Sequence, residues 1–269
     1  MEAAFFDLDK TVVSKSSSLA LTRPMYRAGL VTRGQLLKGA YAQLVYLLLG
    51  ADEKKMDRVK ESLLALTKGW EQSKVEGVVR EALLEYIDPY FYAEALDLIE
   101  LHRALGRRVF IVSSSPEEVV RPLVERLGDV DVIATRTRIV DGKYTGEMEF
   151  YCYGEGKADA IRKVAEEQLI DLSGSYAYSD SITDLPMLES VGVPVAVNPD
   201  RDLRREAEQR GWKIRDFRRP VRLRPHLPKV SAPSAAVTAA VGSVVVAGAL
   251  GWVLLRRFAA GRHGAAGRS

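Results

Sequence analysis

The stretch Ala3-Ala4-Phe5-Phe6-Asp7-Leu8-Asp9-Lys10-Thr11 decides the fold. Its four apolar residues predict a short buried strand, and two carboxylates follow where that strand ends. Three later apolar runs also end in polar residues: Arg108–Val112 before Ser113, Tyr176–Tyr178 before Ser179-Asp180, and Pro194–Val197 before Asn198. A helical pattern follows each run. This alternation predicts an α/β fold with a parallel sheet, whose ligand site lies outside the carboxyl ends of the strands.

Two segments interrupt the alternation. Residues 14–92 show helical periodicity without a convincing strand, so we expect a helical insert after the first strand. Residues 35–49 within it are very apolar, and the uncharged run of residues 39–51 is too short to span a bilayer. They are expected to be core of the insert, or alternatively a surface that docks on a membrane or accepts an acyl chain. Asp141-Gly142, in the second segment, predicts the turn of a β-hairpin.

Composition excludes several classes of protein. The chain has 269 residues, 47% hydrophobic and 28% charged, which is typical of a globular protein that buries its own core. Its single cysteine, Cys152, excludes an intramolecular disulfide scaffold and a cysteine-rich zinc module. The three histidines are scattered along the chain, so a metal site built from histidines is not expected. A net charge of +3 is too small to indicate nucleic acid as a partner.

The C-terminal part has the pattern of a membrane anchor. Residues 230–255 carry no charge, and the last 21 of them would span roughly 30 Å as a helix, the thickness of the bilayer hydrocarbon. Arg256 and Arg257 follow at once. Basic residues are more numerous before the apolar segment than after it, which predicts that the globular part stays in the cytoplasm. The N-terminus has no signal-peptide pattern, in agreement. The alternatives are a buried helix or a disordered tail rich in alanine and glycine.

Asp7 and Asp9 can divide the work of cleaving a phosphate ester. One carboxylate can attack phosphorus and form an aspartyl phosphate, while the other protonates the leaving oxygen and later activates water. The two groups then need opposite protonation states, which a nearby Mg²⁺ and unequal burial can provide. Two aspartates at this spacing are common in protein sequences. The interpretation as a phosphate-cleaving pair therefore depends on their position at the end of a strand.

Three later motifs can serve the same chemistry. Ser113, Ser114 and the backbone N–H groups beside them can hold phosphoryl oxygens at a helix start, although a serine there is more often a helix cap. Lys157 lies in the first turn of a predicted helix, where the helix dipole disfavours a cation. A lysine is usually a solvated surface residue, but this unfavourable position indicates that Lys157 has a function. Asp180 and Asp184 suit Mg²⁺, although either could cap a helix.

Together these motifs resemble those of the haloacid dehalogenase-like (HAD) phosphatase superfamily. Residues 7–11 (DLDKT) match its first signature and residues 179–184 (SDSITD) its last. The resemblance covers residues 3–217 and is nearest to subfamily IB, the phosphoserine phosphatase-like group. It implies a Rossmann-like HAD core with a parallel sheet and a helical C1-type cap inserted after the first strand.

The resemblance also implies a role for each residue. Asp7 is the nucleophile and Asp9 the general acid/base, while Ser113, Ser114 and Lys157 hold the phosphoryl group. Mg²⁺ is bound by Asp7, by the backbone carbonyl of Asp9 and by Asp180, and Asp184 supports the metal shell or Lys157. The activity implied is Mg²⁺-dependent hydrolysis of a phosphate monoester through an aspartyl-phosphate intermediate.

The expected domains follow from the same reading. Residues 1–13 and 93–217 form the catalytic core and residues 14–92 the cap. A basic, proline-rich tether follows at 218–233, a transmembrane helix at 234–255 and a basic tail at 256–269. The protein is therefore expected to be a single-pass, C-terminally anchored membrane protein with a cytoplasmic catalytic domain. Its oligomeric state stays open.

Other functions stay open at this point. The DKT of residues 9–11 also resembles the motif of ion-pumping ATPases, but Val12 and Val13 replace the Gly-Thr of that motif. Phosphoserine phosphatases of the subgroup carry an acidic residue where this chain has Ser16, which weakens phosphoserine as the substrate. A lysophospholipid phosphate, another small phosphate ester, transfer of phosphate to an alcohol, and a non-catalytic membrane-tethered module are the alternatives.

Overall fold

Seven strands form the central sheet of the computed structural model, which describes residues 1–32, 34, 64–65, 67–82, 86–87 and 90–223. Their order is β5-β4-β3-β1-β6-β7-β8, and neighbouring strands run parallel except β4 and β5. The strands are β1 Ala3–Asp7, β3 Arg108–Pro116, β4 Asp131–Val140, β5 Lys143–Phe150, β6 Tyr176–Ser179, β7 Val193–Val197 and β8 Lys213–Arg215. The α/β core with a mostly parallel sheet is confirmed.

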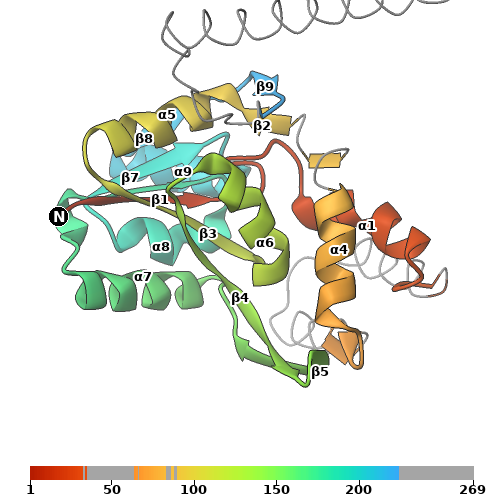
Figure 1. The fold of residues 1–269 in the computed structure, drawn as a ribbon. Helices are drawn as coiled ribbons and strands as arrows, with labels where there is room; N and C mark the ends of the chain where they lie inside the picture. Colours follow the sequence, from red (N-terminus) through yellow and green to blue (C-terminus); the bar gives the residue numbers. More distant parts are fainter. Residues whose placement is uncertain (33, 35–63, 66, 83–85, 88–89, 224–269) are drawn as a thin grey trace, which may run out of the picture. The chain divides into compact units, whose positions relative to one another are not determined.

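Helices cover both faces of this sheet (Figure 1). Helices α5 (Ala93–Ala104) and α6 (Glu117–Val124) pack on one face, and α7 (Glu155–Gln168), α8 (Leu185–Glu189) and α9 (Arg201–Arg210) on the other. Successive residues of β1 point to opposite faces. Phe6 therefore stacks on Tyr178 in the core beneath α5 and α6, while Phe5 stacks on Phe110 in the other core. Burial on both faces explains why β1 is apolar without alternation.

The hairpin predicted at Asp141-Gly142 is present between β4 and β5. Both turn residues have positive φ, 50° and 72°, as a tight hairpin turn requires. The tip also reaches the helical insert, because Lys143 pairs with Glu71 in an isolated bridge and the Tyr144 N–H donates to the Trp70 carbonyl at 3.0 Å. The hairpin thus connects the central sheet to the insert.

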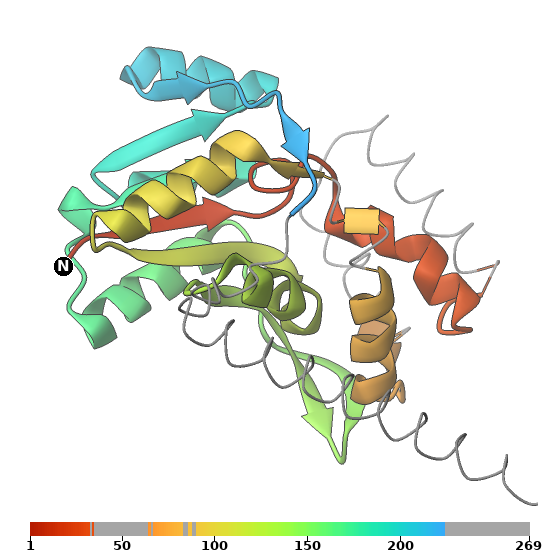
Figure 2. The same ribbon diagram turned by 45° about the horizontal axis from the view of Figure 1, so that its top comes forward.

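Helices α1 (Ser17–Arg27) and α4 (Gln72–Ala82) lie between β1 and the short strand β2 (Phe91–Tyr92) in the chain. They contact each other, and α4 also contacts α6. Both lie beyond the carboxyl end of β1 (Figures 1 and 2). Helical structure was expected in this part of the chain, whereas the apolar segment 35–49 lies outside the described residues. The limits of the predicted cap stay a prediction.

The two connections between core and insert lie side by side. Val13, on the way out, pairs antiparallel with Phe91 on the way back. The short strand β9 (Pro220–Val221) pairs with the other edge of β2. Glu94 accepts hydrogen bonds from the backbone N–H groups of Arg218 and Arg219, so the first residues of the predicted tether are held against the core.

The rest of the predicted C-terminal anchor lies outside the described residues. This holds for the tether beyond residue 223, the transmembrane helix at 234–255 and the tail at 256–269. Among the residues that the structure describes, no helix combines the length and the apolar character needed to cross a membrane.

Candidate active site

A cavity of about 380 Å³ lies at the carboxyl ends of β1, β3 and β6, where the sequence places the site. Six of the predicted site residues line it, and Ser113 is buried in β3 without lining it. Those six are Asp7, Asp9, Ser114, Lys157, Asp180 and Asp184. The topology explains the convergence, because β1 lies between β3 and β6 and their carboxyl ends share one edge of the sheet.

Lys157 is the centre of a buried ion-pair network. Its Nζ donates to Oδ1 of Asp7 at 2.6 Å and to Oδ2 of Asp184 at 2.8 Å. Ser179 Oγ donates to the same Asp184 oxygen at 2.6 Å. All four residues are buried, so each charge depends on these partners in place of water. The lysine is therefore no surface residue of α7, which supports the functional interpretation of its place in the first turn.

Burial and crowding of carboxylates perturb the titration of this network. Burial, together with the charges of Asp184 and Asp180, raises the pKa of Asp7 to about 8, although Lys157 opposes the shift. Burial lowers the pKa of Lys157, but the charges of Asp7 and Asp184 outweigh it and raise the pKa above its usual value. The lysine thus stays charged between the two carboxylates.

Asp9 is bound by the beginning of the helical insert. The Ser17 backbone N–H donates to Oδ1 of Asp9 at 2.9 Å, and Ser17 Oγ donates to Oδ2 at 3.2 Å. Ser16 Oγ is more distant, at 3.5 Å from Oδ2. Burial raises the pKa of Asp9, while the hydrogen bonds from Ser17 and Ser16 act in the opposite direction. A raised pKa suits a carboxyl that must donate a proton.

Asp180 lies opposite Lys10, which is the residue between the two motif positions Asp9 and Thr11. Lys10 has a φ of 61°, unusual for a lysine, and this conformation places Nζ 3.9 Å from Oδ2 of Asp180. Burial raises the pKa of Asp180 to about 6, and Lys10 opposes the shift. The Asp200 N–H donates to the Asp180 backbone carbonyl at 2.8 Å, which fixes the loop after β6.

The carboxylates of this cavity fit Mg²⁺ only if the ion retains other ligands. No group of three or more His, Cys, Asp or Glu side chains within the described residues forms a ready set of metal ligands. Mg²⁺ usually binds one or two carboxylates and keeps several waters or substrate oxygens. Asp7 and Asp180 supply such carboxylates. Aspartates outnumber lysines among the residues that line the cavity, four to two, so the cavity has an excess of acidic groups.

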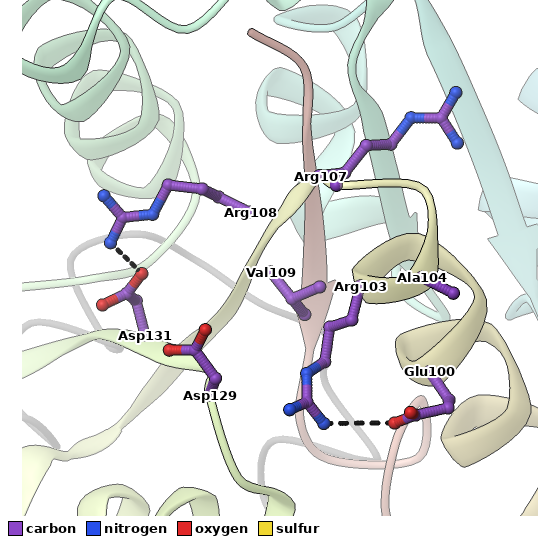
Figure 3. Close-up of a pocket in the computed structure, with 9 residues that line it drawn as sticks. Glu100, Arg103, Ala104, Arg107, Arg108, Val109, Asp129 and Asp131 are labelled. Carbon is purple, nitrogen blue, oxygen red and sulfur yellow. Dashed lines mark hydrogen bonds and ion pairs between the residues drawn. The ribbon is translucent and has the colours of Figure 1, made fainter.

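A second cavity, of about 410 Å³, opens near the amino end of β3 and the end of α5 (Figure 3). Two of its arginines form ion pairs with acidic residues of the same cavity. Arg103 lies 3.1 Å from Glu100, and Arg108 forms an ion pair with Asp131. These ion pairs lie at the edge of the sheet away from Asp7, and each neutralises its own charges. The first cavity, which contains the predicted residues, is therefore the candidate active site.

Fold and site together define an α/β enzyme of the phosphoryl-transfer type. Asp7 and Asp9 lie at the end of β1, and the buried Lys157 contacts Asp7. Two further aspartates, at positions 180 and 184, follow β6, which is the neighbour of β1. The comparisons with known proteins agree. A family model for haloacid dehalogenase-like hydrolases matches residues 4–189, more than half of the chain. The chain therefore belongs to the haloacid dehalogenase-like hydrolase family.

Relatives of the chain include proteins named as phosphatases. A probable phosphatase of Mycobacterium tuberculosis is 52% identical over 96% of this chain and 90% of its own length. A phosphoserine phosphatase of the same species is 33% identical, over 91% of this chain and 79% of its own length. A histidinol-phosphatase of Neisseria meningitidis is 30% identical, over 80% of this chain and 98% of its own length. The predicted enzyme class, a phosphoric monoester hydrolase of the HAD family, agrees with these names.

A solved structure shares the fold over most of the described chain. It is a protein of unknown function from Bordetella pertussis, with a TM-score of 0.72 and 27% identity. The match covers 80% of this chain and 98% of that one. The likeness supports the fold expected from the resemblance in the sequence.

Sequence reasoning missed several residues of the site. Ser17 and Ser115 were not singled out, although their hydroxyls lie 3.0 Å apart and connect to Asp9. The sequence motif contains Ser179 without assigning it a role, and it does not predict that Tyr153 and Lys10 line the cavity. A serine run such as residues 16–18 indicates a helix start but does not show which hydroxyl faces a carboxylate.

Proposed function

We propose that this protein hydrolyses a phosphate monoester, with Asp7 as nucleophile and Asp9 as general acid/base. The observation that carries the proposal is the contact of Lys157 with Asp7 inside a cavity that Asp9 also lines. A buried cation beside the attacking carboxylate can stabilise the charge of the transferring phosphoryl group. Membership of a hydrolase family with relatives named as phosphatases supports the same reaction.

In the first half-reaction, a carboxylate oxygen of Asp7 forms a bond to phosphorus as the ester oxygen leaves. Asp9 donates its proton to that oxygen, so the alcohol departs neutral. Lys157 and the backbone around Ser114 bind the phosphoryl oxygens. In the second half-reaction, Asp9 takes a proton from water as the water oxygen attacks phosphorus. The bond to Asp7 breaks, phosphate leaves, and Asp7 is restored.

Mg²⁺ would be held by Asp7 and Asp180, with the backbone carbonyl of Asp9 as a further ligand. When bound, it would neutralise part of the negative charge of the carboxylates and the phosphate. The carboxylate chemistry of the cavity and its excess negative charge support this ion. The residues of the chain still orient the substrate and transfer the proton.

The test is phosphate release by the full chain and by Asp7→Asn, with Mg²⁺ and with EDTA. The substrate panel contains phosphoserine, histidinol phosphate, glycerol phosphate, lysophosphatidate and sugar phosphates. We expect at least one ester to be cleaved only with Mg²⁺ and only by the Asp7 enzyme. Turnover that survives in a folded Asp7→Asn variant would refute the proposed nucleophile. Formation of a new phosphate ester when alcohol is added would identify transfer in place of hydrolysis.

The described part of the cavity does not favour phosphoserine. Ser16 lines the cavity where phosphoserine phosphatases of the subgroup carry an acidic residue, and the cationic Lys10 lines it too. A substrate ammonium would lack its carboxylate partner there. Relatives named for phosphoserine and for histidinol phosphate have similar identity to this chain, so likeness alone does not choose the ester. The panel decides between them.

We also propose that the C-terminal segment anchors the enzyme to a membrane, with the catalytic domain on the cytoplasmic side. The support is the uncharged stretch of residues 230–255 and the basic residues that flank it. An anchor would keep the enzyme beside membrane-borne esters, which favours a lysophospholipid phosphate as one candidate substrate.

A further inference from the structure

Ser17 holds both oxygens of the Asp9 carboxyl. Its backbone N–H donates to Oδ1 at 2.9 Å and its Oγ donates to Oδ2 at 3.2 Å. Ser17 is 1% exposed, so its two donors are shielded from water, while Asp9 is partly buried. A carboxyl bound at both oxygens by a single residue cannot turn about its own axis without breaking a hydrogen bond.

A second serine fixes the hydroxyl of Ser17. Ser115 Oγ lies 3.0 Å from Ser17 Oγ, and Ser115 is only 4% exposed in β3. The Ser115 N–H in turn donates to Ser113 Oγ at 3.2 Å. A line of hydrogen bonds therefore runs from Asp9 through Ser17 to the strand beside β1. Each member comes from a different part of the chain: the motif loop, the first turn of α1, and β3.

The position of Ser17 at the helix start explains how it can bind in this way. The first backbone N–H groups of a helix have no partner within the helix, and a carboxylate there is favourable. The N-cap residue Ser16 makes no side-chain capping bond to α1. The Asp9 carboxyl thus accepts a backbone hydrogen bond that a capping side chain usually accepts. Its orientation therefore depends on the position of α1.

We propose that Ser17 is a positioning residue, which fixes the Asp9 carboxyl for proton transfer to the leaving oxygen of the ester, and that Ser115 holds the Ser17 hydroxyl for this task. The inference rests on the proposed role of Asp9. Proton transfer requires the donor oxygen within hydrogen-bond reach of the leaving oxygen, and small displacements at a reacting centre lower rates strongly. Ser17 acts through Asp9 and does not itself line the cavity.

The test compares two esters that differ in their need for a proton. p-Nitrophenyl phosphate loses a stable anion, whereas glycerol phosphate loses an alkoxide that must be protonated. The value of kcat/KM reports the step in which the leaving group departs. In the full chain, Ser17→Ala should lower kcat/KM for glycerol phosphate about tenfold or more, a fraction of a typical general-acid effect. For p-nitrophenyl phosphate the loss should stay below about threefold, because little proton transfer is required.

Three further variants complete the design. Ser17→Thr keeps a hydroxyl and should restore most of the glycerol phosphate rate, while Ser115→Ala should reproduce the selective loss more weakly. Ser175→Ala is the matched control, because Ser175 is also buried and its Oγ accepts from the Ala3 N–H at 2.9 Å, outside the cavity. It should change thermal stability without distinguishing the two esters.

The outcomes separate this inference from the proposed function. Equal losses on both esters in Ser17→Ala, or no loss at all, would overturn the positioning role. A folded Ser17→Thr variant that stays as selective as Ser17→Ala would overturn it too. If wild type cleaves another alkyl ester of the panel in place of glycerol phosphate, that ester takes its place in the comparison. Wild-type protein without Asp7-dependent turnover of any ester, p-nitrophenyl phosphate included, would overturn the proposed function, and this inference with it.

Discussion

Nζ of Lys157 lies 2.6 Å from Oδ1 of Asp7, although the two residues are 150 positions apart in the chain. The returning strand β5 brings them together. Its last residue, Phe150, pairs antiparallel with Arg136, and α7 begins soon after it at Glu155, beside the carboxyl end of β1. The same ammonium also contacts Asp184. One cation thus holds the proposed nucleophile and the last acidic residue of the motif in a common network.

Replacing Lys157 should damage both stability and activity. Lys157→Met leaves the buried carboxylates of Asp7 and Asp184 without their cation, which costs about 3–5 kcal/mol when a buried pair is broken. We expect a lower urea midpoint and loss of turnover. Lys163→Met is the matched control on α7, because its ammonium is exposed and lies 3.9 Å from Glu167. Unfolding curves that coincide for the two variants would contradict the network.

Stability should depend on pH through His102. Burial and the charge of Arg107 lower the pKa of His102 to about 4, against 6.5 for a free imidazole. Between these values the unfolded chain binds more protons than the folded one, so the free energy of unfolding falls as pH decreases from 6.5 towards 4. The expected loss from this residue between pH 7.5 and pH 5 is about 2 kcal/mol.

The raised pKa values of Asp7 and Asp180 change stability in the opposite direction, so the measurement must isolate His102. Urea unfolding of wild type and His102→Gln at pH 7.5 and pH 5 does this. The variant has no titrating imidazole beside Tyr178, so it should lose less stability than wild type on acidification. The same pH dependence in both proteins would refute the buried neutral histidine.

The C-terminal segment should determine where the enzyme is found. The full chain is expected in the membrane fraction of lysed cells, and a chain that ends at residue 229 in the supernatant, because residues 230–255 carry no charge. Carbonate washing separates an inserted helix from a basic segment that only binds anionic headgroups. A full chain that remains in the supernatant would refute the anchor.

Local sequence predicted the parts of the molecule that depend on strand ends and turns. The acidic motif at Asp7 and Asp9 and the hairpin at Asp141-Gly142 both follow from such signals, since a strand end or a tight turn needs only neighbouring residues. The contact of Ser17 with Asp9 could not be predicted in this way. It depends on how the insert returns across the sheet edge, where Val13 pairs with Phe91. Residues far apart in sequence set that geometry.

Gly156 should be needed for the position of Lys157, its neighbour. A Cβ at Gly156 would lie 2.3 Å from the Tyr151 carbonyl oxygen, closer than atoms can approach. Gly156→Ala must therefore shift the start of α7 or the loop before it, and Lys157 would move relative to Asp7. We expect kcat/KM to fall about 10- to 100-fold, since small displacements at a reacting centre have effects of this size.

Gly77→Ala provides the control for that substitution. Gly77 lies within α4, and a Cβ there meets no atom within 4 Å, so the alanine should stabilise the protein by roughly 0.5–1 kcal/mol and leave kcat/KM unchanged. Measuring kcat/KM and thermal midpoints for both variants separates helix propensity from steric conflict. A Gly156→Ala enzyme as active as wild type would show that Lys157 tolerates the shift, and that the close approach to Tyr151 does not position it.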